Sequence, residues 1–286
     1  MTAEIPASAT ETIARAYEED LADIGDVTTL ATIPQDHRSV ATIIARSSGC
    51  MAGIPIVTMC FAHIDAALTV TRKANDGDMV DAGTVVVEAA GSTRSLLTAE
   101  RVALNLFGRL SGVATATRAF VDAVDGTGTV ISDTRKTTPG LRSLEKYAVA
   151  IGGGVNHRMG LYDAVMIKDN HLLASESIAD AVTKARALVG TGMLVEIEVD
   201  TLDQLTEAVN TDADVVLLDN MTSRELREAV RIVNGSMRTE ASGGVTLETV
   251  REIAETGVDV ISVGWLTHSA PALDVAMDLE TVDEKR

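Results

Sequence analysis

Residues 194–220 read LVEIEVDTLDQLTEAVNTDADVVLLDN, and this stretch decides the fold class. Short apolar runs at residues 194–199 and 214–218 flank residues 202–209, where apolar side chains recur every three or four positions. Short runs of this kind are typical of buried strands, and the wider spacing is typical of an amphipathic helix. The stretch therefore predicts a strand–helix–strand unit, which is the building block of a parallel sheet.

The same alternation extends in both directions along the chain. Further apolar runs are found at residues 129–132, 164–167, 238–241 and 259–263, and further helical patterns at 175–189, 223–233 and 247–256. Six short strand–helix repeats favour closure into a barrel over an open sheet.

The chain before about residue 125 has a different pattern. Helical patterns at 11–22, 56–64 and 96–124 are interleaved with extended runs at 39–46, 68–72 and 84–89. We therefore predict an α/β protein in which an N-terminal α/β sandwich-like domain packs on an incomplete (β/α) TIM-like barrel. The predicted ranges are 1–112 for the first domain, 113–270 for the barrel and 271–286 for a C-terminal helix that packs back on the first domain.

Composition excludes several classes of protein. The 286 residues carry 42 Asp and Glu against 24 Lys and Arg, a net charge of −18, which argues against a nucleic-acid binder. A hydrophobic content of 46% argues against disorder. Without a signal-like N-terminus or an apolar run of about 18 residues, we expect a cytoplasmic protein with no membrane partner. The acidic excess fits either an ordinary cytosolic protein or a halophilic one, and the latter is modestly favoured.

Polar side chains follow the predicted barrel strands, whose carboxyl ends surround one mouth. Five of them are cationic, namely Arg135, Lys136, His157, Arg158 and Lys168. Any one alone is more simply a loop residue, but five neighbouring cations repel one another unless an anion fills the site. The set therefore predicts a multiply charged anionic substrate.

Two glycine-containing loops, Ser242-Gly243-Gly244 and Gly264, follow the last two strands. Glycine exposes backbone N–H groups that bind phosphate, although a lone glycine is more often simple turn chemistry. Two carboxylates, Glu198 and Asp219, end neighbouring strands and could accept sugar hydroxyls or hold Mg²⁺. Two structural alternatives remain open: Glu198 pairs with Lys168, or Asp219 caps the following helix.

Several motifs resemble one known family. They are LTAERVALN at 97–105, LSGVAT at 110–115, DTRKTTPGLR at 133–142, EKYA at 145–148, NHR at 156–158, IKDNH at 167–171, LDN at 218–220 and LTHS at 266–269. The sequence is similar in these motifs to quinolinate phosphoribosyltransferases, over nearly the whole chain. Trp265 departs from the pattern, because the family usually has a small residue there, and it could alter the phosphate loop or pack below it.

The resemblance implies transfer of phosphoribosyl from phosphoribosyl pyrophosphate to quinolinate, with release of pyrophosphate and CO₂ and formation of nicotinate mononucleotide for NAD biosynthesis. Arg135, His157, Arg158 and Lys168 would bind the quinolinate carboxylates, with Arg101 reaching in from a neighbouring subunit. Lys136 would face the pyrophosphate. Glu198 and Asp219 would face the ribose and Mg²⁺, which the substrate also holds. The 5′-phosphate would lie on Ser242, Gly243, Gly244 and Gly264.

The same resemblance adds Thr137, Val263 and His268 to the substrate site and makes Lys168, Glu198 and Asp219 the catalytic set. It also implies a homodimer with composite active sites, or a higher assembly such as a hexamer. Two rival functions stay open. Lys168 could form a Schiff base in an aldolase, or the fold could serve a non-catalytic protein that binds phosphate or another oxyanion.

Overall fold

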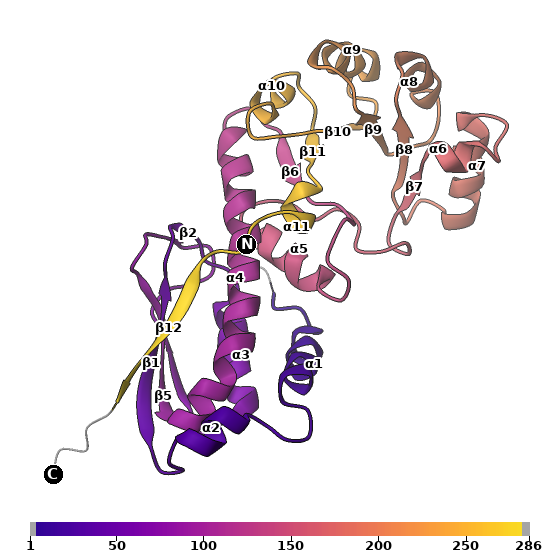
Figure 1. Ribbon diagram of the computed structural model, residues 1–286. Helices are drawn as coiled ribbons and strands as arrows, with labels where there is room; N and C mark the ends of the chain where they lie inside the picture. Colours follow the sequence, from indigo (N-terminus) through magenta and orange to yellow (C-terminus); the bar gives the residue numbers. More distant parts are fainter. Residues whose placement is uncertain (1–3, 282–286) are drawn as a thin grey trace. The chain divides into compact units, whose positions relative to one another are not determined.

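The computed structural model describes residues 4–281, which fall into two compact units. The first unit comprises residues 4–118, 138–153 and 269–281, and the second comprises residues 119–137 and 154–268. Figure 1 shows the helices and strands of both units, coloured along the chain. None of the helices in residues 4–281 is long and apolar enough to cross a membrane.

A four-stranded antiparallel sheet in the order β12-β1-β5-β3 organises the first unit. Its strands are β1 (Arg38–Ala45), β3 (Thr69–Arg72), β5 (Val85–Ser92) and β12 (Val275–Thr281), and β2 (Gly49–Cys50) pairs separately with β4 (Met79–Val80). In β1 the side chains of Ala41, Ile43 and Ala45 are buried at alternate positions. This period of two places one face of the strand in the core.

Five helices accompany this sheet, namely α1 (Ala9–Leu21), α2 (Val27–Thr32), α3 (Ile54–Ile64), α4 (Thr93–Ala123) and α5 (Arg142–Ile151). Asp26 caps α2 by accepting a hydrogen bond from the Thr29 backbone N–H at 3.0 Å. The 31-residue helix α4 is the longest of the described helices, and its final residues from 119 onward belong to the second unit.

The C-terminal segment differs from the sequence prediction. The helix expected over residues 271–286 is wrong for the described part, because Val275–Thr281 form β12 and pair antiparallel with β1. An exposed edge of β1 offers unpaired backbone groups, and β12 satisfies them. The segment does return to the N-terminal domain, as expected, and residues 282–286 lie outside the described residues.

Two glycines of α4 let the segment before β12 cross the helix closely. The Leu273 N–H donates to the Gly108 carbonyl at 2.8 Å, and a Cβ on Gly112 would collide with the Pro271 carbonyl oxygen. A side chain at Gly112 would therefore push the segment away from the helix.

Six parallel strands form the second unit, in the order β6-β11-β10-β9-β8-β7. They are β6 (Val130–Ser132), β7 (Val165–Ile167), β8 (Val195–Val199), β9 (Val215–Asp219), β10 (Arg238–Ser242) and β11 (Val260–Ser262). The helices are α6 (Asp169–Leu172), α7 (Ile178–Val189), α8 (Leu202–Ala208), α9 (Ser223–Val233), α10 (Val250–Ala254) and α11 (Trp265–His268). The first two strands of this unit in chain order, β6 and β7, are the two edges of the sheet and do not pair with each other. The sheet is therefore not closed, as expected for the predicted incomplete barrel (Figure 1).

The boundaries of the units differ from the predicted domain limits. Residues 138–153, which include α5, lie between β6 and β7 in sequence but belong to the first unit. An internal ion pair accounts for this placement, because the buried Glu145 carboxylate accepts from Arg109 of α4 at 2.7 Å and from the Thr138 N–H at 3.0 Å. A buried carboxylate needs such partners, so Glu145 ties α5 to α4.

The Gly112 crossing makes a prediction about stability. Alanine normally stabilises a helix interior by about 1 kcal/mol relative to glycine. At Gly112 we expect the reverse, a loss of about 1–3 kcal/mol from overpacking against Pro271. Urea unfolding of Gly112→Ala measures it, and Gly192→Ala is the control because its Cβ would meet nothing within 4 Å. A Gly112→Ala protein at least as stable as the parent would contradict the close crossing.

Candidate active site

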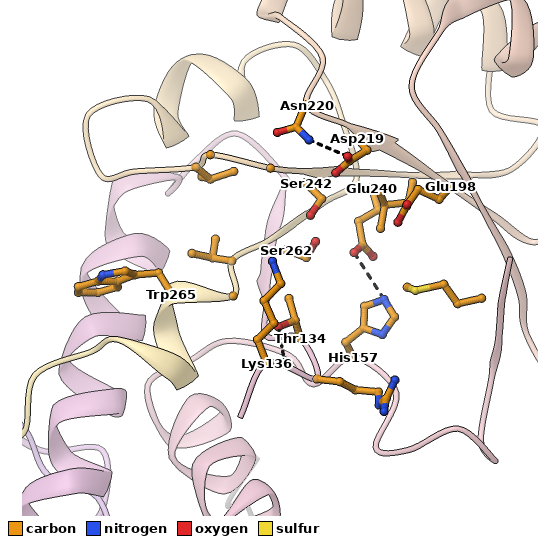
Figure 2. Close-up of a pocket in the computed structure, with 18 of the residues that line it drawn as sticks. Thr134, Lys136, His157, Glu198, Asp219, Asn220, Glu240, Ser242, Ser262 and Trp265 are labelled. Carbon is orange, nitrogen blue, oxygen red and sulfur yellow. Dashed lines mark hydrogen bonds and ion pairs between the residues drawn. The ribbon is translucent and has the colours of Figure 1, made fainter. Parts of the chain in front are cut away.

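A cavity of about 820 Å³ lies at the carboxyl ends of the parallel strands of the second unit (Figure 2). Its lining residues follow or end each of the strands β6 to β11. They are Thr134, Arg135, Lys136, His157, Arg158, Met166, Lys168, Glu198, Leu217, Asp219, Asn220, Glu240, Ser242, Gly243, Gly244, Val245, Thr246, Ser262, Val263, Gly264, Trp265 and His268. The cavity thus occupies the mouth at which active sites of barrels are found.

Most residues that the sequence suggested for the site line this cavity. These are Arg135, Lys136, His157, Arg158, Lys168, Glu198, Asp219, Ser242, Gly243, Gly244, Val263, Gly264 and His268. Thr137 is not among the lining residues, and its backbone N–H donates to the Arg135 carbonyl at 3.0 Å. Arg101 belongs to the first unit and is likewise absent from the lining.

Two arginines supply adjacent positive charges in the cavity. Burial lowers the pKa of Arg158, and the charge of Arg135 lowers it further. One guanidinium nitrogen of Arg158 donates to the Ala164 carbonyl at 3.1 Å. The Nε of Arg135 is buried and has no hydrogen-bond partner within residues 4–281. Two neighbouring guanidinium groups with a donor to spare are suited to a carboxylate, which accepts two parallel hydrogen bonds from arginine.

Lys168 and Glu198 form an ion pair at the mouth of the cavity. Lys168 directly follows β7, Glu198 lies on β8, and the lysine Nζ donates to Glu198 Oε2. The side chains remain 41% and 17% exposed, so both can still reach a ligand. The pairing of Glu198 with Lys168, which the sequence left open as a structural alternative, is therefore observed. It leaves one oxygen of the carboxylate and further hydrogens of the ammonium group for binding.

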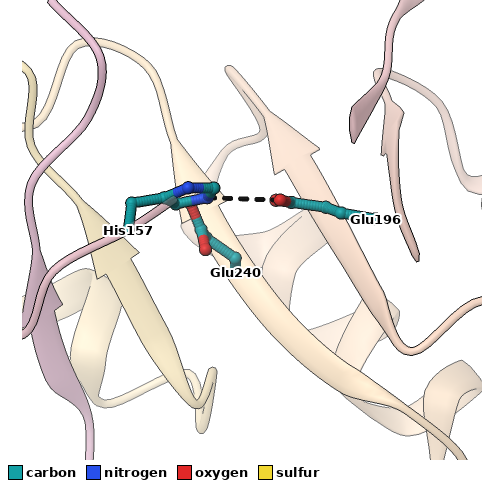
Figure 3. A group of neighbouring side chains, drawn as sticks. All are labelled: His157, Glu196 and Glu240. Carbon is teal, nitrogen blue, oxygen red and sulfur yellow. Dashed lines mark ion pairs between the residues drawn. The ribbon is translucent and has the colours of Figure 1, made fainter. Parts of the chain in front are cut away.

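His157 lies deeper, and two buried glutamates of the barrel interior face the same nitrogen of its ring (Figure 3). Its Nε2 is 3.2 Å from Glu196 Oε2 on β8 and 3.5 Å from Glu240 Oε1 on β10. Burial on its own would lower the pKa of His157, but the hydrogen bonds and charges of both glutamates outweigh it and raise this pKa to about 10. The Arg158 N–H donates to Nδ1 at 2.7 Å, a contact that favours an unprotonated Nδ1 and so opposes that rise.

Asp219 and the glycine loop after β10 form the opposite side of the cavity. Asp219 ends β9, and its Oδ2 accepts from the Asn220 side-chain amide at 2.6 Å. The capping alternative for Asp219 is wrong, because Thr222 caps α9 and accepts from the Glu225 N–H. Gly243 has a φ of +97°, and a Cβ there would collide with the Asn220 side chain. The loop therefore requires glycine at this position.

Lys136 reaches the cavity past Gly264. A Cβ on Gly264 would lie 2.9 Å from Lys136 Cδ, so a larger residue there would make the lysine stem shift. The Thr267 hydroxyl donates to the Lys136 carbonyl at 2.7 Å and fixes the backbone of the lysine. Gly264 leads directly into α11, whereas Gly244 is separated from α10 by residues 245–249.

Comparison with known proteins accounts for this arrangement. Residues 26–111 match the model for the quinolinate phosphoribosyl transferase N-terminal domain, and residues 113–278 match the model for the C-terminal domain. The chain belongs to the quinolinate phosphoribosyltransferase family. Every residue that lines the cavity falls within the C-terminal family domain.

Similar relatives of the family span nearly the whole chain. The probable carboxylating nicotinate-nucleotide pyrophosphorylase of Bacillus subtilis is 46% identical over 260 residues, which cover 91% of this chain and 90% of the relative. The decarboxylating quinolinate phosphoribosyltransferase 1b of Nicotiana tabacum is 44% identical, with 93% and 81% covered. Among solved structures, NadC from Streptococcus pyogenes superposes with a TM-score of 0.95 at 38% identity, with 99% and 100% covered.

Sequence reasoning did not assign several cavity residues to the site. They are Thr134, Met166, Leu217, Asn220, Glu240, Val245, Thr246, Ser262 and Trp265. Glu240 could have been found from the period of two, because it precedes Ser242 by two positions on β10 and shares its face. Trp265 lines the cavity, and its ring centroid lies 6.3 Å from that of Phe120. No pattern in the sequence marks that ring contact.

Arg101 has a different setting, on α4 in the first unit. Its side chain is 66% exposed and pairs with the neighbouring Glu100 at 3.3 Å. It borders a separate cavity of about 450 Å³, which is also lined by Asn105 and Asp274. An exposed arginine of this kind is available to a second subunit, and its role in the active site stays a prediction.

Proposed function

We propose that this chain transfers the phosphoribosyl group of phosphoribosyl pyrophosphate to quinolinate and releases pyrophosphate and CO₂, leaving nicotinate mononucleotide. The observation that carries the proposal is a cavity with five cationic side chains in a protein of net charge −18, inside a chain of this family. Both substrates are multiply charged anions, and their binding relieves the mutual repulsion of the cations.

The arginines account for the choice of acceptor. Quinolinate carries two carboxylates on adjacent ring carbons, and planar carboxylates pair bidentately with guanidinium groups. Arg135 and Arg158 would hold them together with His157 and Lys168, which line the same cavity. Nicotinate has one carboxylate fewer and would leave part of this charge uncompensated.

The transfer step needs orientation and electrostatic stabilisation. The pyridine nitrogen forms a bond to C1 of the ribose as the bond from C1 to pyrophosphate breaks, and the leaving group takes that electron pair. Lys136, Gly243, Gly244 and Gly264 line the cavity. Lys136 would stabilise the charge that develops on pyrophosphate, and the glycine loops would bind the 5′-phosphate through backbone N–H groups. Glu198 and Asp219 would stabilise the oxocarbenium-like ribose centre.

The new bond between the pyridine nitrogen and C1 of the ribose also makes decarboxylation possible. N-alkylation turns the ring into an electron sink, so the C2–carboxylate bond can break with its electron pair left on C2, which then takes a proton. Release of CO₂ removes one negative charge from the arginine-lined side of the cavity. The product mononucleotide is therefore held there less strongly than quinolinate.

Mg²⁺ is the cofactor that we propose, held by the polyphosphate of the substrate together with Glu198 and Asp219. The residues fit a magnesium ion, because both are carboxylates in the cavity and oxygen donors are the ligands that it prefers. Glu198 commits only Oε2 to Lys168. When bound, Mg²⁺ would neutralise charge on the leaving pyrophosphate.

The two rival functions explain the site less well. A Schiff base needs an uncharged amine at Lys168, whereas Lys168 is ion-paired with Glu198. A protein that only bound oxyanions would have no use for Glu198 and Asp219, because both carboxylates repel an anion in the same cavity.

We also propose a homodimer with composite active sites, either alone or within a higher assembly such as a hexamer, in which Arg101 enters the neighbour's cavity. The exposure of Arg101 on α4 supports this role. The cytoplasmic location expected from the sequence stays a prediction. The large negative charge outside the cationic cavity further favours a protein that works in concentrated salt, where screening lets anionic substrates approach.

A direct assay tests the proposed reaction. Protein, Mg²⁺, phosphoribosyl pyrophosphate and quinolinate are mixed, and chromatography should detect nicotinate mononucleotide with an equal amount of CO₂. Nicotinate replaces quinolinate in the parallel reaction and should give little product. Turnover of nicotinate without turnover of quinolinate would overturn the substrate assignment.

Arg135→Ala tests the binding of the carboxylates. Arg135 lines the cavity, so loss of its charged hydrogen bonds, worth about 1.5–3 kcal/mol, should raise the KM for quinolinate about 10- to 100-fold. Steady-state kinetics measure this, with the exposed Arg227→Ala of α9 as the control. An unchanged KM would remove Arg135 from the site.

Complementation tests the composite site. Arg101→Ala and Lys168→Ala should each be inactive alone, because each lacks one half of the same site. Mixing the two after subunit exchange should restore part of the activity, since one site of each mixed dimer keeps both residues. Mass spectrometry shows whether the subunits have exchanged. If they have and no activity returns, the result would count against a shared site.

A melting series in KCl tests the adaptation to salt. If self-repulsion of the acidic surface limits stability, the melting temperature should rise steadily from low to molar KCl as screening increases. The same series in an equal concentration of sucrose controls for general solvent effects. A melting temperature that does not change with KCl would contradict the proposed adaptation to salt.

A further inference from the structure

Two buried glutamates and one buried aspartate surround His157, and none of the roles assigned so far uses them. Glu196 and Glu240 face the imidazole from β8 and β10, and their side chains are 4% and 6% exposed (Figure 3). Both contacts converge on the same ring nitrogen, Nε2, at 3.2 and 3.5 Å. The ring is therefore held from the side of the barrel interior.

Asp133 holds the backbone of the same histidine. It directly follows β6 and is fully buried, and its Oδ1 accepts from the His157 N–H at 2.9 Å. Its Oδ2 accepts from the Asn156 side-chain amide at 2.7 Å. The Asp133 N–H in turn donates to the Val155 carbonyl at 3.2 Å, next to the bridge between Ser132 and Val155. The segment that carries His157 is thus fastened to the end of β6.

Burying these carboxylates costs free energy of folding, so the stability of the fold does not explain why they are there. Glu196 is 3% exposed, so its carboxylate loses its hydration on folding, a cost that an apolar side chain at this position would not carry. Glu196 Oε1 is buried and has no hydrogen-bond partner within the described residues. Buried carboxylates in this position suggest that the orientation of His157 matters more than the cost in stability.

We propose that Asp133, Glu196 and Glu240 are positioning residues that fix His157 in one orientation toward the quinolinate end of the cavity. The inference rests on the proposed function. Asp133 sets where the backbone of His157 lies, and the two glutamates set the angle of its ring, so that little freedom is lost when the substrate binds. Asp133 and Glu196 are not among the residues that line the cavity, and Glu240 lines it beside His157. In the proposed role all three act through His157.

A metal ion is the other use for one histidine and two glutamates, whose ligand atoms lie within 4.8 Å of one another. The charge around the cluster argues against it. Arg158 is close enough to Glu196 for their charges to interact, and Arg135 is close enough to Arg158. Cations beside the cluster already compensate the glutamates and would repel a divalent ion.

A double-mutant cycle on quinolinate binding tests the proposal. The dissociation constant is measured by calorimetry for the parent protein, Glu196→Ala, Glu240→Ala, His157→Ala and each glutamate change combined with His157→Ala. We expect each glutamate variant to bind quinolinate about tenfold more weakly, the effect of one charged contact, and to lose that effect when His157 is absent. The KM for phosphoribosyl pyrophosphate should stay within about twofold.

Three further variants and one control separate positioning from folding. Glu196→Gln and Glu240→Gln keep an acceptor oxygen and the shape, so they should recover part of the lost affinity. Asp259→Asn is the control, since Asp259 accepts from Thr239 at the start of β10, outside the cavity lining. Asp133→Asn replaces one acceptor oxygen by a donor and should weaken quinolinate binding as the glutamate variants do.

The outcomes are distinguishable. Equal losses with and without His157, or a parallel rise in the KM values of both substrates, would overturn the positioning role. Binding of Mn²⁺ that is lost in Glu196→Gln and Glu240→Gln would also overturn it in favour of a metal site. Failure of the parent protein to turn over quinolinate would instead reject the proposed function.

Discussion

Repulsion between like charges in a confined space is the constraint on which the site depends. Arg135, Lys136, His157, Arg158 and Lys168 line one cavity, and their charges raise each other's energy. The protein offsets part of this repulsion from within, through the pair of Lys168 with Glu198 and the contacts of His157 with Glu196 and Glu240. The rest must be offset by a ligand, and anionic substrates supply the charge that is missing.

The parallel sheet makes this concentration of charge possible. Because all six strands run in the same direction, residues far apart in sequence come to the same mouth. Residues two positions apart on a strand point to the same side but lie at different depths below the mouth. On β8, Glu198 lines the cavity while Glu196 lies deeper against His157. Glycines at positions 243 and 264 provide the room that the Asn220 and Lys136 side chains need.

Much of this could be predicted from the sequence, and the failures have physical causes. Runs such as residues 214–218 and the helical spacing at 223–233 are local signals, and both elements form there. Residues 275–281 were misassigned because their conformation is set by the open edge of β1, far away in sequence. Likewise, α5 belongs to the first unit because Glu145 reaches Arg109, a pairing that no local pattern reveals. Glu240 was missed although its spacing from Ser242 could have identified it.

Charge compensation by the acceptor is the central claim, and calorimetric binding of quinolinate and nicotinate to the same protein tests it most directly. The two ligands differ by one carboxylate, so the difference in affinity isolates the contribution of the second charge. One additional set of charged hydrogen bonds predicts that quinolinate binds about 10- to 100-fold more tightly, with a difference that shrinks in high salt. Equal affinities for the two ligands would contradict the claim.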